Sequence, residues 1–183
     1  MVLLHSPPGE LGATAPAFRL PGVDGRDHTL EEYRESPVLV VMFICNHCPY
    51  VLAIEERLIA LAGALLERNV RFVGISCNDP TNYPEDSFDN MKARAKKKAY
   101  PFDYLYDGSQ QTAREYGAVC TPDFFVYDQE RKLRYRGRLD DSPRNPAAVH
   151  KEELKEAILA LLEGRPVAAR QNNTMGCSIK WKE

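Results

Sequence analysis

The chain has 183 residues, of which 44% are hydrophobic and 27% charged, so it can form one domain with a hydrophobic core. Its formal net charge of −2 gives no overall attraction to nucleic acid or an anionic membrane, and no apolar run approaches the roughly 18 residues of a membrane-spanning helix. The first residues lack a signal-peptide pattern, so we expect a single cytoplasmic domain over 1–183, with a core over about 12–164 and a tail over 165–183.

The N-terminal part predicts a β-hairpin followed by a short helix. The hairpin is expected in FRLPGVDGRDHTL, at 18–30, where glycines mark turns between short apolar pieces. Thr29 and Glu32 form a capping-box pattern, which predicts the start of the helix. The apolar, β-branched run VLVVMFI, at 38–44, is typical of a strand buried on both faces of a sheet.

A helix is predicted next because apolar residues recur at helical spacing after Pro49, and Pro suits the first turn. This stripe consists of Val51, Ile54, Leu58, Leu61 and Leu65. The later predicted elements are a strand at 70–77, a helix capped by Asp86 or Ser87, a strand at 102–107, a helix at 109–117, a hairpin of strands at 123–128 and 132–137, and a helix at 150–164. This order predicts an α/β fold with a central mixed β-sheet flanked by helices and an N-terminal β-hairpin.

Two of the five cysteines, Cys45 and Cys48, lie between the strand and the helix in the stretch FICNHCPYVL. A helix N-terminus presents unpaired N–H groups and partial positive charge, which favour the nucleophilic thiolate. The pattern predicts a redox dithiol in which Cys45 is the exposed attacking thiol and Cys48 the resolving thiol. His47 is expected to stabilise the thiolate and make the couple more oxidising, with a solvated loop histidine as the alternative.

Two other interpretations of the cysteine pair remain open. The thiols could be buried and inert, although the strand–helix junction disfavours this. A structural zinc site needs about four ligands, but the sequence holds no second cysteine pair, and His5, His28 and His150 are scattered. We therefore predict no metal site, and no organic cofactor because electrons would pass through sulfur.

Four stretches carry a family resemblance: CNHC, FVGISCNDP, DGSQQTAREYGAVCTPDFFVYDQERKLRYRG and, in the tail, GCSIKW. Over roughly 12–180 the chain resembles the thioredoxin-like superfamily and, within it, the peroxiredoxin-like redoxin branch related to AhpC/TSA proteins. From the residues alone, Thr121-Pro122 is an ordinary turn signal. The resemblance implies a thioredoxin-like fold in which this bond is cis, lies beside the dithiol and leaves the Thr121 backbone free to pair with an extended substrate.

The chain also departs from the patterns of this superfamily. Thioredoxins place a tryptophan directly before the first cysteine and an acid six residues before it, where this chain has Ile44 and Leu39. The buried proton acceptor is therefore missing or comes from elsewhere. Peroxiredoxins need a threonine three residues before the reactive cysteine, and that position holds Cys45 if Cys48 reacts or Met42 if Cys45 reacts.

Further residues are candidates for the surroundings of the site. Cys120, close to the expected cis bond, is either a third redox thiol or a packing residue. Arg138 either stabilises a thiolate in the substrate-binding cleft or lies in a solvated loop. Cys77 is expected to be inert core, and Cys177 to lie in a docked strand or to exchange with Cys45.

The predicted function is a thiol–disulfide oxidoreductase that acts on a protein or small-molecule disulfide and is recycled by a cellular thiol reductant. The alternatives are a thiol peroxidase with an unconventional peroxide pocket, a copper-binding or assembly protein, and a redox-silent interaction module. The copper alternative would have His150 as its only late histidine ligand. The basic stretch KARAKKKA lacks interleaved aromatic residues and is expected to be a solvated helix face rather than a nucleic-acid site.

Overall fold

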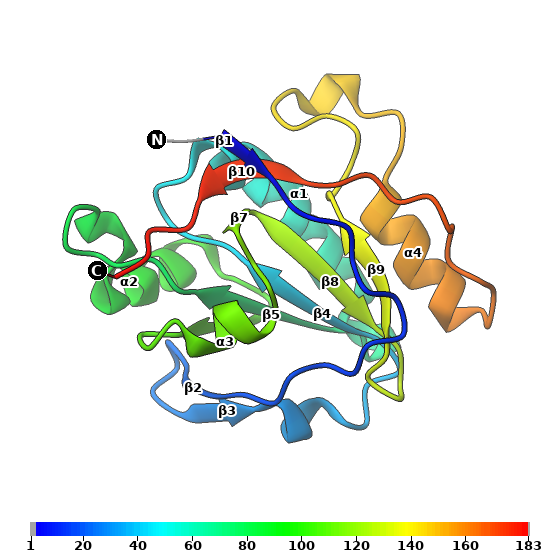
Figure 1. The fold of residues 1–183 in the computed structure, drawn as a ribbon, viewed down its shortest axis with the longest axis horizontal. Coiled ribbons are helices and arrows are strands. Elements are labelled where there is room, and N and C mark those ends of the chain that lie inside the picture. Colours follow the sequence, from blue (N-terminus) through cyan, green and yellow to red (C-terminus); the bar gives the residue numbers. More distant parts are fainter. Residues whose placement is uncertain (1–2, 183) are drawn as a thin grey trace.

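The structure is a computed structural model that describes residues 3–182 (Figure 1). The strands are β1 (Leu3–His5), β2 (Arg19–Pro21), β3 (Asp27–Thr29), β4 (Leu39–Phe43), β5 (Arg71–Ser76), β6 (Asp103–Tyr106), β7 (Cys120–Thr121), β8 (Asp123–Tyr127), β9 (Leu133–Gly137) and β10 (Met175–Ser178). The α-helices are α1 (Pro49–Leu65), α2 (Phe88–Lys98), α3 (Gln111–Glu115) and α4 (Glu153–Leu162). Short 3₁₀ turns join them: η1 (Leu30–Tyr33), η2 (Leu66–Arg68), η3 (Pro84–Asp86) and η4 (Pro146–Ala148).

The central sheet has the strand order β6-β5-β4-β8-β9, with β4 in the middle. β4 runs parallel to β5 and antiparallel to β8, while β8 and β9 form an antiparallel hairpin. All five residues of β4 are buried, as expected for a strand covered on both faces. The predicted mixed sheet is confirmed.

Alternate side chains of β4 enter two separate hydrophobic cores because successive residues of a strand point to opposite faces. Val40 and Met42 pack with residues of α1, α2 and α4. Val41 and Phe43 pack with residues of α3, η1 and the N-terminal hairpin. The helices therefore cover both faces of the sheet, and β4 is fixed from both sides at the point where the cysteine pair begins.

Helix α1 is anchored by its apolar face and by one buried acid. Of the predicted stripe, four residues are buried and Leu61 is half-buried: the buried ones are Val51, Ile54, Leu58 and Leu65. The carboxylate of Glu55 is also buried and accepts hydrogen bonds from Arg94 of α2 at 2.7 and 2.8 Å and from Tyr100 at 2.6 Å. These contacts fix α1 against α2, so the helix that follows the cysteines has a defined position.

The N-terminal hairpin is confirmed as β2 paired with β3, but the helix predicted after it is only a 3₁₀ turn. The backbone N–H of Thr29 donates to the Glu32 carboxylate at 3.0 Å, as the capping box predicts. The turn stops after four residues because the chain must enter β4, which starts at Leu39. The pattern thus identified where the turn begins but not how short it is.

The tail forms the middle strand of a second, antiparallel sheet with the order β1-β10-β7 (Figure 1). Cys177 pairs with Leu3 on one side and with Thr121 on the other, which confirms the docked strand expected for the tail. A Cβ atom at Gly176 would lie 2.0 Å from the carbonyl oxygen of Thr121. The two strands can therefore come this close only because residue 176 has no side chain.

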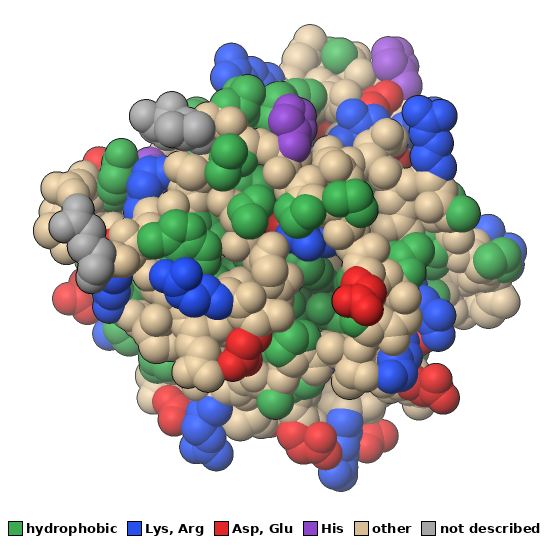
Figure 2. Space-filling view, viewed as in Figure 1, with side chains coloured by type: hydrophobic (Ala, Val, Ile, Leu, Met, Phe, Trp, Pro, Cys, Tyr) green, Lys and Arg blue, Asp and Glu red, His purple; other side chains and the backbone are tan. Residues whose placement is uncertain are grey.

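The surface carries mixed charge rather than one charged patch on the face drawn in Figure 2, where Lys and Arg side chains lie among Asp and Glu. On the basic helix α2, Lys92 pairs with Asp89, and Lys98 pairs with Glu55. This partial neutralisation fits a solvated helix face better than a nucleic-acid site. Among residues 3–182, no helix has both the length and the apolar character needed to cross a membrane.

We expect Gly176→Ala to lower the free energy of unfolding by about 1–3 kcal/mol, because the added methyl group must push β10 away from Thr121. Gly63→Ala is the matched control, since an added Cβ there meets no atom within 4 Å. Because position 63 is an exposed position within a helix, Gly63→Ala should raise the free energy of unfolding by about 0.5–1 kcal/mol. Denaturant unfolding measures both variants, and equal effects would contradict the close approach of β10.

Candidate redox site

The cysteine pair lies where β4 ends and α1 begins. Cys48 is the N-cap residue of α1, and Pro49 occupies the first helical position, where its missing N–H costs nothing. The backbone N–H groups of Val51 and Cys177 help to lower the pKa of Cys48. Val51 is the third residue of α1, so this N–H belongs to the first turn of the helix, where backbone N–H groups lack partners within the helix. The helix N-terminus therefore acts directly on Cys48.

Both sulfurs of the pair are buried, which contradicts the expected exposure of Cys45. Cys45 is 2% exposed and Cys48 is 0% exposed. The Cys45 sulfur lies 3.3 Å from the hydroxyl oxygen of Thr121, and the Cys48 sulfur, when protonated, donates to the Thr121 carbonyl at 3.2 Å. The prediction was wrong because a strand more than seventy residues away in sequence packs against the cysteines.

The surroundings of the two sulfurs favour a thiolate on Cys48 over one on Cys45, the thiol predicted to attack. Hydrogen bonding from Cys45 outweighs burial and, with help from Cys177 and the Val51 N–H, lowers the pKa of Cys48 to about 5. Burial, the bond to Cys48 and the charge of Asp86 raise the pKa of Cys45 well above its usual value. Neighbouring thiols that share one site hold one charge between them, and it lies at the helix N-terminus.

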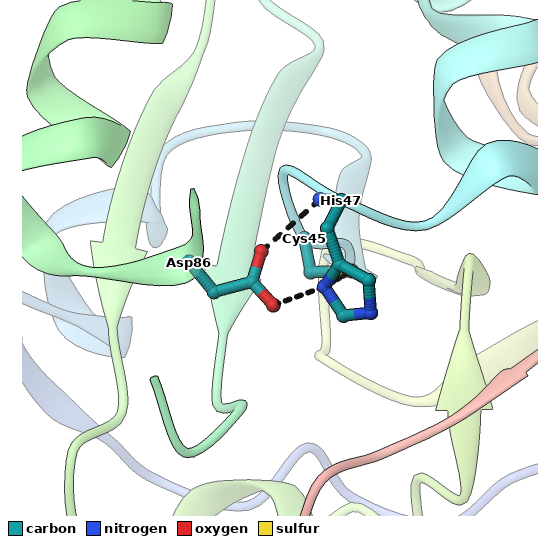
Figure 3. A group of neighbouring side chains, drawn as sticks. All are labelled: Cys45, His47 and Asp86. Atoms are coloured by element: carbon teal, nitrogen blue, oxygen red, sulfur yellow. Dashed lines mark hydrogen bonds and ion pairs between the residues drawn. The ribbon is translucent and has the colours of Figure 1, made fainter. Parts of the chain in front are cut away.

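Asp86 is a buried acid beside the dithiol, and the sequence had indicated it only as a possible helix cap (Figure 3). Its carboxylate accepts from the His47 ring Nδ1 at 2.5 Å and from the Asn78 amide at 2.8 Å. It also accepts from the backbone N–H groups of Asn46 at 2.7 Å and His47 at 3.1 Å. Burial opposes its charge, but these bonds outweigh burial and lower the pKa of Asp86 below its usual value. Ser87 is the cap of α2 instead.

His47 is held in place and is not a solvated loop histidine. Its side chain is 8% exposed, and its ring stacks on Tyr83 with the ring centres 4.3 Å apart. Figure 3 shows the Nδ1 edge of the ring turned toward Asp86. The same Nδ1 lies 3.9 Å from the Cys45 sulfur, which is long for a hydrogen bond. His47 therefore lies beside Cys45 without a strong direct hydrogen bond to its sulfur.

The peptide bond between Thr121 and Pro122 is cis, as the resemblance implies, and Thr121 contacts both sulfurs of the pair. The Thr121 backbone is not free for a substrate, however, because it pairs with Cys177 of β10. That part of the prediction was wrong in this arrangement, since the chain's own tail fills the place expected for the substrate strand.

The third thiol at the dithiol is Cys177. Its sulfur lies 3.0 Å from the sulfur of Cys48, whereas the predicted exchange was with Cys45. The Cys120 sulfur lies 4.0 Å from the carbonyl oxygen of Pro122, and burial raises the pKa of the Cys120 thiol. Both observations favour a packing role for Cys120. Cys77 lies in the opposite core, where burial raises its pKa, in agreement with an inert thiol.

Arg138 forms an ion pair with Glu153 of α4 rather than with a thiolate. Its Nε lies 2.5 Å from the carboxylate, so the predicted role in stabilising a thiolate is not supported. Arg138 does line a cavity of about 160 Å³ together with Pro122 and Tyr50. The cavity lies at the cis bond and keeps Arg138 as a candidate for contacting a bound substrate.

Cys45, His47 and Asp86 also have the chemistry of metal ligands, and within residues 3–182 their ligand atoms lie within 4.8 Å of one another. They fit a metal poorly, because the Asp86 carboxylate already accepts four N–H donors and one of these is the His47 ring. His150, which the copper alternative needs, is exposed and donates its backbone N–H to Asp141. The geometry therefore favours sulfur redox chemistry over metal binding.

Two solved structures resemble the whole chain. A crystal structure of an uncharacterized conserved protein from Geobacillus kaustophilus is 47% identical with a TM-score of 0.95, and the match covers 100% of this chain and 97% of that one. A hypothetical protein from Sinorhizobium meliloti 1021 is 42% identical with a TM-score of 0.93, covering 97% of this chain and 98% of that one. No curated protein matches the sequence.

A more distant solved structure supports the fold, and a family match supports the family. A putative thiol:disulfide interchange protein DsbE from Chlorobium tepidum is 24% identical with a TM-score of 0.63, covering 84% of this chain and 98% of that one. This similarity and the strand order confirm the expected thioredoxin-like fold. Residues 11–136, more than half of the chain, match the AhpC/TSA family. The chain therefore belongs to the AhpC/TSA family.

Proposed function

We propose that this protein is a thiol–disulfide oxidoreductase with Cys45 and Cys48 as its redox dithiol. The observation that supports this most directly is the Cys48 sulfur at the N-terminus of α1, where Cys45 and backbone N–H groups stabilise a thiolate. A thiolate next to a second thiol is the arrangement that disulfide exchange requires. Membership of the AhpC/TSA family is consistent with redox use of cysteine.

The reaction consists of two exchanges. The Cys48 thiolate attacks one sulfur of a substrate disulfide, forms a mixed disulfide and releases the other substrate sulfur as a thiolate. Cys45 then gives up its proton and attacks the Cys48 sulfur, which forms the Cys45–Cys48 disulfide and releases the second substrate thiol. Two electrons pass to the substrate, and a cellular thiol reductant restores the dithiol. This order of attack reverses the predicted one because the thiolate lies on Cys48.

Burial and Asp86 help keep the proton on Cys45 until the second step, whereas the hydrogen bond with Thr121 favours the thiolate. Burial contributes most to the raised pKa of Cys45, the bond to Cys48 adds to it, and the Asp86 carboxylate adds its negative charge. The Thr121 hydroxyl holds the Cys45 sulfur at 3.3 Å. His47, bonded to Asp86, is a positioning residue that fixes this carboxylate beside the thiols.

The dithiol should cycle between its reduced and oxidised forms in a glutathione redox titration. We expect mass spectrometry after alkylation to find a Cys45–Cys48 disulfide in the wild type. Cys48→Ser should reduce turnover of a dye-labelled disulfide peptide to the rate of uncatalysed exchange, and Cys45→Ser should slow it. Cys77→Ala, in the opposite core, is the matched control and should keep activity. A pair that stays reduced throughout the titration would contradict the proposal.

The ultraviolet absorbance of the reduced protein should show a thiolate titrating near pH 5, and Cys48→Ser should lose this step. An unfolded thiol titrates near about pH 8.5, so between these two values the unfolded state binds more protons than the folded state. Stability of the reduced wild type should therefore rise with pH across this window, and fall as the pH drops toward 5. A first thiolate step at the ordinary thiol pKa would refute the assignment to Cys48.

Asp86→Asn should lower the free energy of unfolding by about 1–3 kcal/mol, because an amide cannot satisfy all the donors that face this buried carboxylate. Asp89→Asn is the matched control three residues along, where the side chain is 93% exposed and pairs with Lys92 at 3.4 Å. The control should change stability by less than about 0.5 kcal/mol. Denaturant unfolding at neutral pH compares the two, and similar losses would argue against a special role for Asp86.

A further inference from the structure

The C-terminal strand occupies the strand edge beside the cis proline. β10 pairs antiparallel with β7, so that Cys177 lies opposite Thr121 and Ser178 lies opposite Cys120. Addition of an extended segment to a free strand edge is a general way to bind a peptide, because main-chain hydrogen bonds supply the affinity. The tail therefore has the geometry of a bound peptide, although it belongs to the same chain.

This pairing also brings a sulfur to the reacting atoms. The Cys177 sulfur is 3.0 Å from the Cys48 sulfur and Cys177 is 2% exposed. A disulfide bond is about 2.05 Å long, so the two sulfurs need to approach by about 1 Å more. Gly176, the residue before Cys177, allows the close approach of β10 on which this contact depends. Cys48 thus has a possible disulfide partner in Cys177 as well as in Cys45.

The reactivity of Cys177 depends on the redox state of its neighbour. Burial and then the interaction with Cys48 raise the pKa of Cys177 to about 12, while the charge of Lys180 lowers it. When Cys48 is part of a disulfide it carries no negative charge, and its contribution to the raised pKa disappears. Cys177 therefore becomes easier to deprotonate when the dithiol is oxidised, which is when a nucleophile beside Cys48 has a bond to attack.

We propose that Cys177 is a third redox thiol and that β10 is an internal substrate of the dithiol, an inference that rests on the proposed function. The Cys177 thiolate attacks the Cys48 sulfur of the Cys45–Cys48 disulfide, so that the Cys48–Cys177 bond forms as the Cys45–Cys48 bond breaks. Cys45 leaves as a thiolate and takes up the proton that Cys177 gave up. The number of disulfides is unchanged, so this exchange needs no added oxidant.

The exchange would set which substrates reach the site. A protein disulfide that binds as an added strand needs the Thr121 edge, and β10 must leave that edge first. A Cys48–Cys177 bond ties β10 covalently in place, whereas a Cys45–Cys48 bond leaves it attached only by strand pairing and packing. The internal bond therefore stores the oxidised state in a form that is closed to protein substrates.

Peptide mapping tests this directly, because trypsin places Cys45 and Cys48 on peptide 35–57 and Cys177 alone on peptide 171–180. The full chain is oxidised with glutathione disulfide, quenched in acid, alkylated and digested without reduction. In Cys45→Ser, a link between these peptides can arise only from Cys48 and Cys177. We expect this link to be the main disulfide of that variant and to appear in the wild type beside the Cys45–Cys48 bond. Cys177→Ser should lose the link and keep the Cys45–Cys48 bond.

The controls separate this inference from the proposed function. Cys77→Ala should show as much of the link as the wild type, and Gly176→Ala should show less because β10 is displaced. A wild type that forms the Cys45–Cys48 bond, with unlinked peptides in Cys45→Ser, overturns the internal substrate and leaves the proposed function standing. The opposite result, a link in Cys45→Ser without any Cys45–Cys48 bond in the wild type, shows that Cys177 is a redox thiol but contradicts the proposed dithiol and, with it, the exchange. If Cys45→Ser fails to fold, the wild-type map decides: a link supports the inference, and no link at any oxidant concentration overturns it.

Discussion

The arrangement of the site depends on one close backbone approach, that of Gly176 in β10 to Thr121 in β7. This approach lets the tail pair with the strand that carries the cis bond. It places the Cys177 N–H and sulfur against Cys48, and it helps bury all three thiols. A side chain at position 176 would move β10, and Cys177 with it, away from Thr121 and Cys48. The absence of a side chain at this one glycine therefore allows the second sheet to contact the thiol at the start of α1.

The electrostatics of the thiol cluster follow from this packing. The pKa of Cys48 is lowered by Cys45, by the first turn of α1 and by Cys177 of β10. Burial raises the pKa of every sulfur in the cluster. The result is one acidic thiol between two weakly acidic ones. Asp86 adds a fixed negative charge beside Cys45 and is itself satisfied by four N–H donors. A buried carboxylate is therefore present near the dithiol although Leu39 occupies the strand position where thioredoxins carry one.

Local patterns in the sequence predict local features well. The apolar run at 38–44, the helical stripe after Pro49 and the Cys-x-x-Cys between them indicated the central strand, the helix and the dithiol, because periodicity reports which faces are covered. The burial of Cys45 and the role of Asp86 could not be predicted in this way. Asp86 meets His47 across 39 positions of sequence, and Cys177 meets Cys48 across 129. Such contacts are set by how whole segments pack, which no local spacing records.

The N-terminal strand β1 is linked to the thiol cluster through its pairing with β10. β1 pairs with β10 through Leu3 with Cys177, Leu4 with Gly176 and His5 with Met175. Any motion that lifts β10 from Thr121 must either break these pairs or carry β1 along with it. A spectroscopic label near the amino terminus would therefore sense the opening of the thiol cluster from a distance, without touching a single cysteine.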